Sequence, residues 1–263
     1  MKNLNILICE GNTPQEGKNF KKVGIPTHTE SLRESLSYYN KDLNIKVINP
    51  CLELDINESV PNLKNFDGLI WGGSSLNIYN NTIEIRRQIS FMKECLKNIK
   101  KILAICWGMQ VAVTAAGGEV KKGEKGSHIG IANNIKLTKD GLNNPLYKNK
   151  ANKFNSPAFN FDEVIKIPEG AIHLASNKIN KIQGLHFKSG ISEIWGIQYH
   201  PEITYEKMIS IIKFRKDSLI NQRNRFKNED EVKNHINFIK EEIKVSEKNS
   251  RMTELKNWLN LIS

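Results

Sequence analysis

Short apolar runs alternate with amphipathic stretches through the first two-thirds of the chain. Residues 4–9, 44–48, 68–71 and 102–105 are apolar runs of strand length, and residues 29–39, 82–99 and 107–116 have helical spacing of apolar residues. This alternation is typical of proteins in which helices connect parallel strands and cover both faces of the sheet. We therefore predict a three-layer α/β fold with a mainly parallel sheet.

Two later parts of the chain have a different pattern. Residues 129–137, 171–175, 182–187 and 194–199 are short apolar runs separated by turn residues, which predicts a small antiparallel sheet. After residue 203, apolar stripes run through charged segments, as in amphipathic helices. We predict one domain over residues 1–202 and a helical extension over residues 203–263 that packs on it. A partner-binding role for these stripes is the alternative.

Composition narrows the class of protein. Among 263 residues, 39% are hydrophobic, and no window is apolar enough for a membrane span. The first nine residues are too short and polar for a signal peptide, so we expect a cytoplasmic protein with no membrane partner. The net charge is +11, but the lysines are spread evenly, and we predict no nucleic-acid binding. The four cysteines fit neither a zinc pattern nor a disulfide framework, so no metal is expected.

Cys106 stands between a predicted strand and a predicted helix. Ile105 ends the apolar run, and good helix formers without proline follow Trp107. A nucleophile at such a sharp strand-to-helix turn has an exposed side chain and lies over the positive end of the helix. That field favours the thiolate, which is the reactive form of cysteine. We predict that Cys106 is a nucleophile with its sulfur exposed.

A general base is predicted at His200. The segment from Gly196 reads Gly-Ile-Gln-Tyr-His-Pro-Glu, so His200 follows a predicted strand and Glu202 lies two residues on. A thiolate nucleophile needs a base within hydrogen-bond reach, and the base needs an orienting group. We predict that Glu202 binds the far imidazole nitrogen of His200.

Backbone amides for an oxyanion are predicted at two places. Glycines follow the third predicted strand, at Gly72 and Gly73, where the backbone can approach a substrate closely. Acyl transfer develops negative charge on the carbonyl oxygen, which preorganised N–H groups stabilise. We predict that the amides of Gly73 and Trp107 form this oxyanion hole.

These motifs closely resemble those of class I, or triad-type, glutamine amidotransferases, especially proteins related to the GMP synthase glutaminase domain. The elbow of that family reads G-I-C-x-G-x-Q, and its histidine segment reads G-[VI]-Q-[FY]-H-P-E; residues 105–110 and 196–202 match them. The resemblance runs from about residue 4 to residue 202. It implies a flavodoxin-like amidotransferase fold.

The resemblance implies that Cys106 attacks the side-chain amide of glutamine, that His200 transfers protons and that Glu202 orients His200. Gly108 and Gln110 would then hold the glutamine. Two positions depart from the family: Ala104 replaces a glycine before the nucleophile, and Asn160 replaces the histidine of an H-x-D-x-V segment. We expect Asn160 to form one wall of the substrate pocket.

The chain has no Gly-rich phosphate loop, so we expect no cofactor and predict that ammonia passes to a separate synthase subunit. The alternative is a hydrolase that cleaves a γ-glutamyl amide of a small amine by the same chemistry. A non-catalytic scaffold is a third hypothesis. Residues 10–27 are far longer than a usual strand-to-helix loop and leave a strand at its ligand-binding end. We expect this loop to be a lid or a specificity loop; the alternative is a surface insertion with no role in the site.

Overall fold

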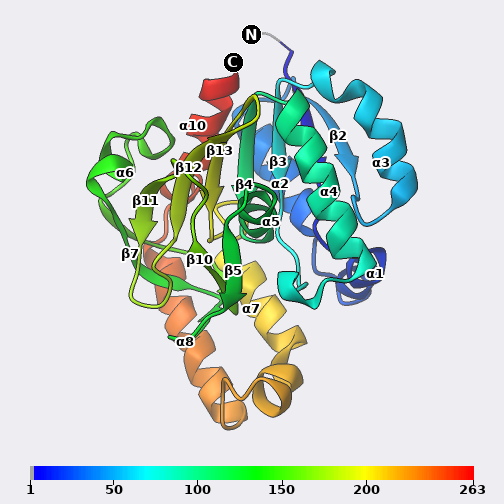
Figure 1. The fold of residues 1–263 in the computed structure, drawn as a ribbon. Helices are drawn as coiled ribbons and strands as arrows, with labels where there is room; N and C mark the ends of the chain where they lie inside the picture. Colours follow the sequence, from blue (N-terminus) through cyan, green and yellow to red (C-terminus); the bar gives the residue numbers. More distant parts are fainter. Residues whose placement is uncertain (1–2) are drawn as a thin grey trace.

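A nine-stranded mixed sheet forms the centre of the molecule in the computed structural model, which describes residues 3–263 (Figure 1). The strand order is β2-β1-β3-β4-β13-β12-β11-β7-β8. The first five strands in this order pair in parallel, and the remaining pairings are antiparallel. The strands are β1 (Asn5–Cys9), β2 (Asn44–Ile48), β3 (Gly68–Trp71), β4 (Lys101–Ile105), β7 (Ala132–Leu137), β8 (Lys153–Ser156), β11 (Ile172–Ser176), β12 (Gly184–Ser189) and β13 (Ser192–Ile197).

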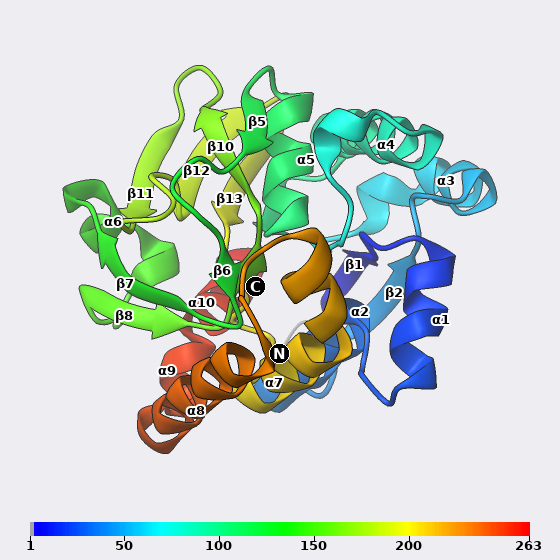
Figure 2. The same cartoon turned by 90° about the horizontal axis from the view of Figure 1, so that it is seen from below.

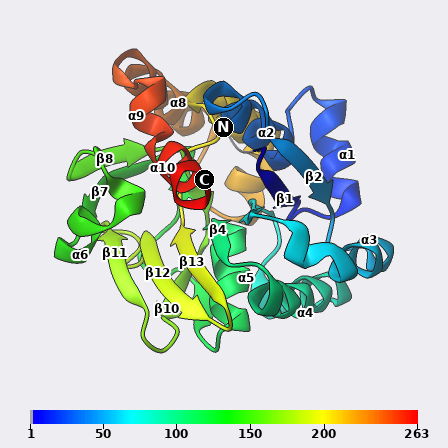
Figure 3. The ribbon, with the colours of Figure 1, turned by 90° about the horizontal axis from the view of Figure 1, so that it is seen from above.

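The predicted α/β fold is confirmed. Helices cover both faces of the parallel half of the sheet (Figure 3): α2 (His28–Tyr39) and α10 (Thr253–Ile262) lie on one face, and α3 (Glu53–Ser59), α4 (Ile83–Asn98) and α5 (Trp107–Ala115) on the other. Alternate residues of β1 separate these layers, because Ile6 and Ile8 pack towards α2 and α10 while Leu7 and Cys9 pack towards α4 and α5.

The antiparallel strands largely extend the main sheet. Two small two-stranded sheets lie apart from it: β5 (Glu119–Lys122) with β10 (Asp162–Lys166), and β6 (His128–Ile129) with β9 (Phe159–Asn160). The helix α6 (Lys139–Asn143) follows β7. Short 3₁₀ turns occupy Val60–Asn65, Ile78–Asn80 and Pro145–Tyr147.

The segment predicted as a long loop, residues 10–27, contains a helix, α1 (Pro14–Lys22). The expectation of an irregular loop was therefore wrong. Thr13 caps the helix by accepting a hydrogen bond from the Glu16 amide, Pro14 occupies the first turn, and Phe20 is buried. These capping residues are visible in the sequence, but the charged stretch around them has little apolar periodicity.

The chain after residue 203 folds back over the carboxyl ends of the parallel strands and then along the body (Figure 2). It forms α7 (Tyr205–Phe214), a π-helical turn (Ser218–Gln222), α8 (Glu229–Val245), α9 (Lys248–Arg251) and α10. The apolar stripe of α8, at Val232, Ile236 and Ile239, is buried against α7 and β6. Trp258 of α10 packs on Gly68, where an added Cβ would lie 2.7 Å from the indole. Within residues 3–263, no helix combines the length and the apolar character that crossing a membrane requires.

Candidate active site

Cys106 lies at the junction of β4 and α5, as the sequence predicts. Its backbone has φ 54° and ψ −103°, a conformation that non-glycine residues rarely adopt. The Cys106 amide donates to the Ile197 carbonyl at 2.7 Å, which joins the turn to the end of β13. The residue is only 4% exposed, so the expectation of an exposed sulfur was wrong: Cys106 lines a cavity below the surface.

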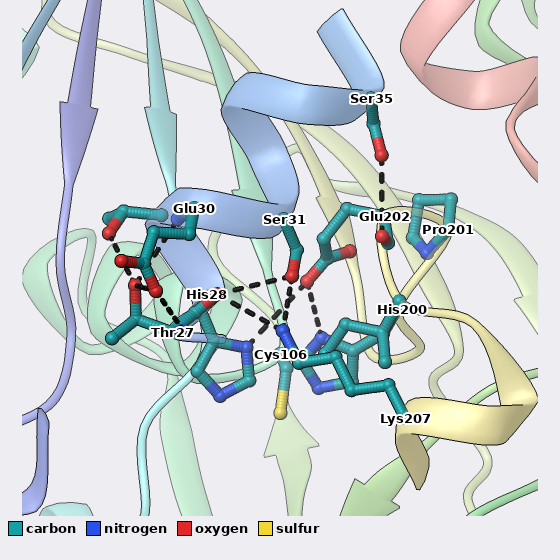
Figure 4. A network of polar contacts seen from close by, with 12 residues as sticks. Thr27, His28, Glu30, Ser31, Ser35, Cys106, His200, Pro201, Glu202 and Lys207 are labelled. Carbon is teal, nitrogen blue, oxygen red and sulfur yellow. Dashed lines mark hydrogen bonds and ion pairs between the residues drawn. The ribbon is translucent and has the colours of Figure 1, made fainter. Parts of the chain in front are cut away.

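The end of β13 places His200 and Glu202 beside Cys106 (Figure 4). His200 Nδ1 lies 2.7 Å from Oε1 of Glu202, and both side chains are buried. The His200 amide donates to the Pro157 carbonyl at 2.7 Å, which holds the backbone beyond the strand. The structure therefore brings together the three side chains that the sequence singled out.

The electrostatics of the three groups are coupled. Burial by itself would lower the pKa of His200, but the carboxylate of Glu202 and the nearby sulfur of Cys106 raise it to about 10. Burial would also raise the pKa of Glu202, but the His200 imidazolium and the nearby His28 hold that pKa well below its usual range. The arrangement therefore favours the imidazolium form of His200 beside the carboxylate of Glu202.

Gly73 and Trp107 lie at the adjacent strand and helix ends. Within residues 3–263, neither of their amides donates to another protein group. A Cβ added to Gly73 would lie 2.7 Å from Cε1 of His200, so only glycine leaves room for the ring there. The Gly108 amide, by contrast, donates to the Gly72 carbonyl at 3.2 Å and holds the two turns together.

The cavity that contains Cys106 has a volume of about 810 Å³, including its open mouth. Gln110 and Asn160 both line it. The polar atoms of Asn160 already have protein partners, because Oδ1 faces His128 Nδ1 at 2.9 Å and Nδ2 donates to the Asp162 carbonyl and to Asn180. Asp162 adds a buried carboxylate to the wall, which accepts hydrogen bonds from Asn77 and Tyr79.

The sequence matches a known family over most of its length. Residues 27–216 match the family model for the glutamine amidotransferase class-I domain. The chain belongs to this family. Members of the family are enzymes of the amidohydrolase type, and this chain is one of them.

Comparison with individual proteins supports the assignment to this family. The chain is 33% identical over 207 residues to a γ-glutamyl-L-1-hydroxyisopropylamide hydrolase of Pseudomonas sp. The matched residues make up 78% of this chain and 69% of that relative. It is 33% identical over 151 residues to a subunit of the glutamine-hydrolysing GMP synthase of Methanocaldococcus jannaschii, covering 56% of this chain and 71% of that relative. The fold is similar to that of a glutamine amidotransferase from Thermotoga maritima, with a TM-score of 0.70, 16% identity, and coverage of 100% and 99% of the two chains.

Part of this amidotransferase cavity is built outside the usual strand-to-helix turns. The segment 10–27 contributes Asn12 and Phe20, and α7 contributes Met208 and Ile211. Arg215, after α7, forms an ion pair with Glu16 of α1 and lies 5.7 Å from the Phe20 ring centroid. The predicted early loop and the start of the C-terminal segment therefore meet across the cavity.

The last helices brace the His200 segment from behind. Arg251 of α9 donates to the carbonyls of Pro201 and Ile203, the latter at 3.0 Å. Glu254 of α10 accepts from the Tyr199 hydroxyl and pairs with Lys150 at 3.0 Å, with both charged side chains almost fully buried. Arg251 and Glu254 lie beyond the part of the chain that matches the family model.

Two side chains at the site escaped the sequence analysis. Gln198 Nε2 donates to the Cys106 sulfur at 3.4 Å, and His28 stacks on His200 with ring centroids 5.1 Å apart. Gln198 belongs to the 196–202 segment that carries His200, which could have indicated its place near the site. No sequence signal pairs His28 with His200, because they come from distant elements.

Three potential metal ligands occur together in the described part of the chain. The donor atoms of His28, His200 and Glu202 all lie within 4.8 Å of one another. A metal at their centre would replace the 2.7 Å hydrogen bond between His200 and Glu202. We interpret the cluster as a hydrogen-bonded pair, His200 and Glu202, with His28 beside it.

Proposed function

We propose that this protein hydrolyses the side-chain amide of glutamine through a thioester on Cys106. The observation that carries the proposal is that Cys106 and His200 line the same cavity while His200 is hydrogen-bonded to the buried Glu202. A cysteine nucleophile, a histidine base and an orienting carboxylate in this arrangement are suited to acyl transfer.

In the proposed reaction, the Cys106 thiolate attacks the amide carbon and forms the C–S bond. The oxyanion receives hydrogen bonds from the free amides of Gly73 and Trp107. The C–N bond then breaks as protonated His200 gives its Nε2 proton to the departing nitrogen. Neutral His200 next removes a proton from water, which attacks the thioester and releases glutamate. Glu202 holds His200 through Nδ1 in both steps.

The cavity wall supplies groups for the amino-acid end of the substrate. Gln110 is proposed to bind glutamine directly, with the backbone at Gly108 supporting the turn. Asp162 is a buried carboxylate in the wall and complements an α-ammonium group. Asn160 is proposed to shape this wall, because its amide already holds His128 and Asn180.

The released ammonia needs an acceptor. Several relatives are named as one subunit of a glutamine-hydrolysing GMP synthase, which supports a synthase on a separate chain as the partner. A cytoplasmic location is part of the same proposal. The partner prediction is tested by co-purification of the full chain with a synthase of the same cell.

A second candidate is a hydrolase of γ-glutamyl amides with a larger amine. One wall of the cavity is apolar and is formed by Phe20, Met208 and Ile211. Ammonia needs no such surface, whereas an amine with an apolar body would bury it. The Pseudomonas relative is named for an amide of this class.

Two measurements test these proposals. Cys106→Ala should abolish glutamate release while the circular dichroism spectrum stays native, and Cys95→Ala, which removes a buried thiol of α4, should retain turnover. Turnover by Cys106→Ala would overturn the triad. Comparison of kcat/KM for glutamine and γ-glutamyl alkylamides then separates the two substrates, since a strong preference for the alkylamides would contradict the glutaminase proposal.

A further inference from the structure

His28 is a second buried imidazole at the active site. It is the first residue of α2, and its ring stacks on that of His200 with an interplanar angle of 27° (Figure 4). Nδ1 of His28 lies 3.8 Å from Oε1 of Glu202, the same oxygen that binds His200. This buried Nδ1 has no hydrogen-bond partner among the described residues, and Oε2 of Glu202 has none either. Glu202 therefore faces two histidines.

Both rings converge on the predicted oxyanion hole. An added Cβ on Gly73 would lie 2.7 Å from Cε1 of His28 and 2.7 Å from Cε1 of His200. His28 also lines the cavity together with Cys106 and His200. Its position is thus beside the reacting atoms rather than behind the catalytic histidine.

The surroundings of His28 determine which nitrogen carries the proton. Burial lowers the pKa of His28 below its usual value, so the ring is neutral at neutral pH. With Nδ1 facing a carboxylate, the proton belongs on Nδ1 and the lone pair on Nε2. Figure 4 shows the far edges of the His28 and His200 rings on the same side as the Cys106 sulfur. The lone pair of His28 therefore faces the cavity.

The backbone holds His28 rigidly. Thr27 and Glu30 form a capping box at the start of α2, with Thr27 N and Glu30 Oε2 2.6 Å apart. The Lys207 ammonium donates to the Thr27 carbonyl at 3.1 Å and to Ser31 of the same helix. A ring fixed in this way is preorganised to accept a hydrogen bond.

We propose that His28 is a second catalytic histidine, whose Nε2 accepts a hydrogen bond from an N–H of the leaving nitrogen. The proposal rests on the proposed amide hydrolysis. As the C–N bond breaks, His200 supplies one proton to the nitrogen, and an N–H already on that nitrogen donates to His28. No proton is transferred to His28, and ammonia or the amine leaves neutral.

The test compares leaving groups that differ in this N–H. His28→Phe keeps an aromatic ring for stacking and removes both nitrogens. Its kcat/KM, which reports acylation, is measured with glutamine and with the γ-methyl ester of glutamate, whose leaving oxygen carries no hydrogen. We expect kcat/KM for glutamine to fall at least 10-fold more than kcat/KM for the ester. A role in stability alone would lower both values equally, and equal losses would overturn the proposal.

Two further variants keep the test decisive. His186→Phe is the matched control, because His186 also stacks on an aromatic ring, that of Trp195, and pairs with Glu193, but it does not line the cavity. It should leave the ratio of the two kcat/KM values unchanged. If His28→Phe does not fold, His28→Leu gives the same comparison. A wild-type protein that cleaves neither substrate would contradict the proposed function itself, whereas cleavage of both with an unchanged ratio in the His28 variants contradicts only the role of His28.

Discussion

The hydroxyl of Tyr199 lies 2.6 Å from Oε1 of Glu254, which ties the residue before His200 to the last helix of the chain. Glu254 is fully buried and also pairs with Lys150. Removing one partner of a buried ion pair leaves an uncompensated charge. We expect Glu254→Gln to lower the free energy of unfolding by about 3–5 kcal/mol, as measured by urea denaturation.

An exposed pair gives the comparison for this prediction. Glu94 and Lys97 lie 2.7 Å apart on the surface of α4. Glu94→Gln should change the free energy of unfolding by less than about 1 kcal/mol. Equal effects of the two substitutions would show that the buried pair contributes no more than a surface pair.

Arg251 is expected to affect turnover more than substrate binding. Its guanidinium holds the carbonyls of Pro201 and Ile203, on both sides of Glu202. A displacement of catalytic groups by about 1 Å can reduce the rate by roughly 100-fold. Arg251→Met should therefore lower kcat by about that factor and leave KM nearly unchanged. Lys248→Met, on the same short helix, is the control and should retain kcat; a fall in that variant would contradict the assignment to Arg251.

The backbone of Cys106 predicts an unusual order of stability. At φ 54° and ψ −103°, a side chain strains the turn, and glycine does not. Cys106→Gly should be more stable than Cys106→Ala by about 1 kcal/mol. The same two substitutions at Cys95, within α4, should show the opposite order by about 1 kcal/mol. Thermal unfolding of the four variants measures both orders. If Cys106→Ala were more stable than Cys106→Gly, the result would refute strain at this turn.

The contact between His200 and Glu202 predicts that the stability of the protein depends on pH. The pKa of His200 is about 10 in the folded protein and about 6.5 in the unfolded chain, so its contribution is complete below about pH 6.5 and disappears as the pH rises through 10. The contribution of Glu202 to the free energy of unfolding has the opposite pH dependence. Because the pKa of Glu202 is lowered in the folded protein, this contribution is complete above about pH 4.5 and is lost in acid.

The wild type should therefore lose more stability between pH 6.5 and 10 than Glu202→Gln, which lacks the charge that raises the His200 pKa. Urea unfolding at several pH values measures the difference. Burial lowers the pKa of Lys207 to about 8 although the charge of Glu202 raises it, so the difference between the two proteins in this range also includes the interaction of Glu202 with Lys207. Parallel curves for the two proteins would contradict the charge interaction.

Gly73 is expected to tolerate no side chain. A Cβ there would lie 2.7 Å from Cε1 of both His28 and His200. Gly73→Ala should lower kcat/KM by at least about 100-fold, because it moves the rings and blocks the oxyanion position. Gly17→Ala in α1, where nothing lies within 4 Å of the added methyl, is the control and should retain full activity.

Much of this site could be predicted because its parts are local. The turn at Cys106 follows from an apolar strand next to good helix formers, and His200 and Glu202 lie in one short segment at the end of a strand. The carboxyl ends of parallel strands meet at one edge of a sheet, so these residues were expected to lie together. The strands at Asn44–Ile48 and Gly68–Trp71 also have the bounds that the pattern predicts.

Other features depend on packing between distant segments. The helix α1 is short and highly charged, and its position is determined by the burial of Phe20 and the contact of Glu16 with Arg215. The buried contacts of Arg251 and Glu254 with the His200 segment likewise have no local pattern. Polar residues in a charged helix are usually on the surface, and only the folded chain shows that these two are not.

The sequence by itself determined the strand-to-helix turn of Cys106, the His200–Glu202 segment and the α/β order of elements, because each depends on residues that are neighbours in the chain. The tertiary structure decided that His28 faces His200, and that residues of α1 and α7 complete the cavity. These contacts arise where helices from opposite ends of the chain pack over one edge of the sheet, and packing of that kind depends on shape and burial across the whole molecule.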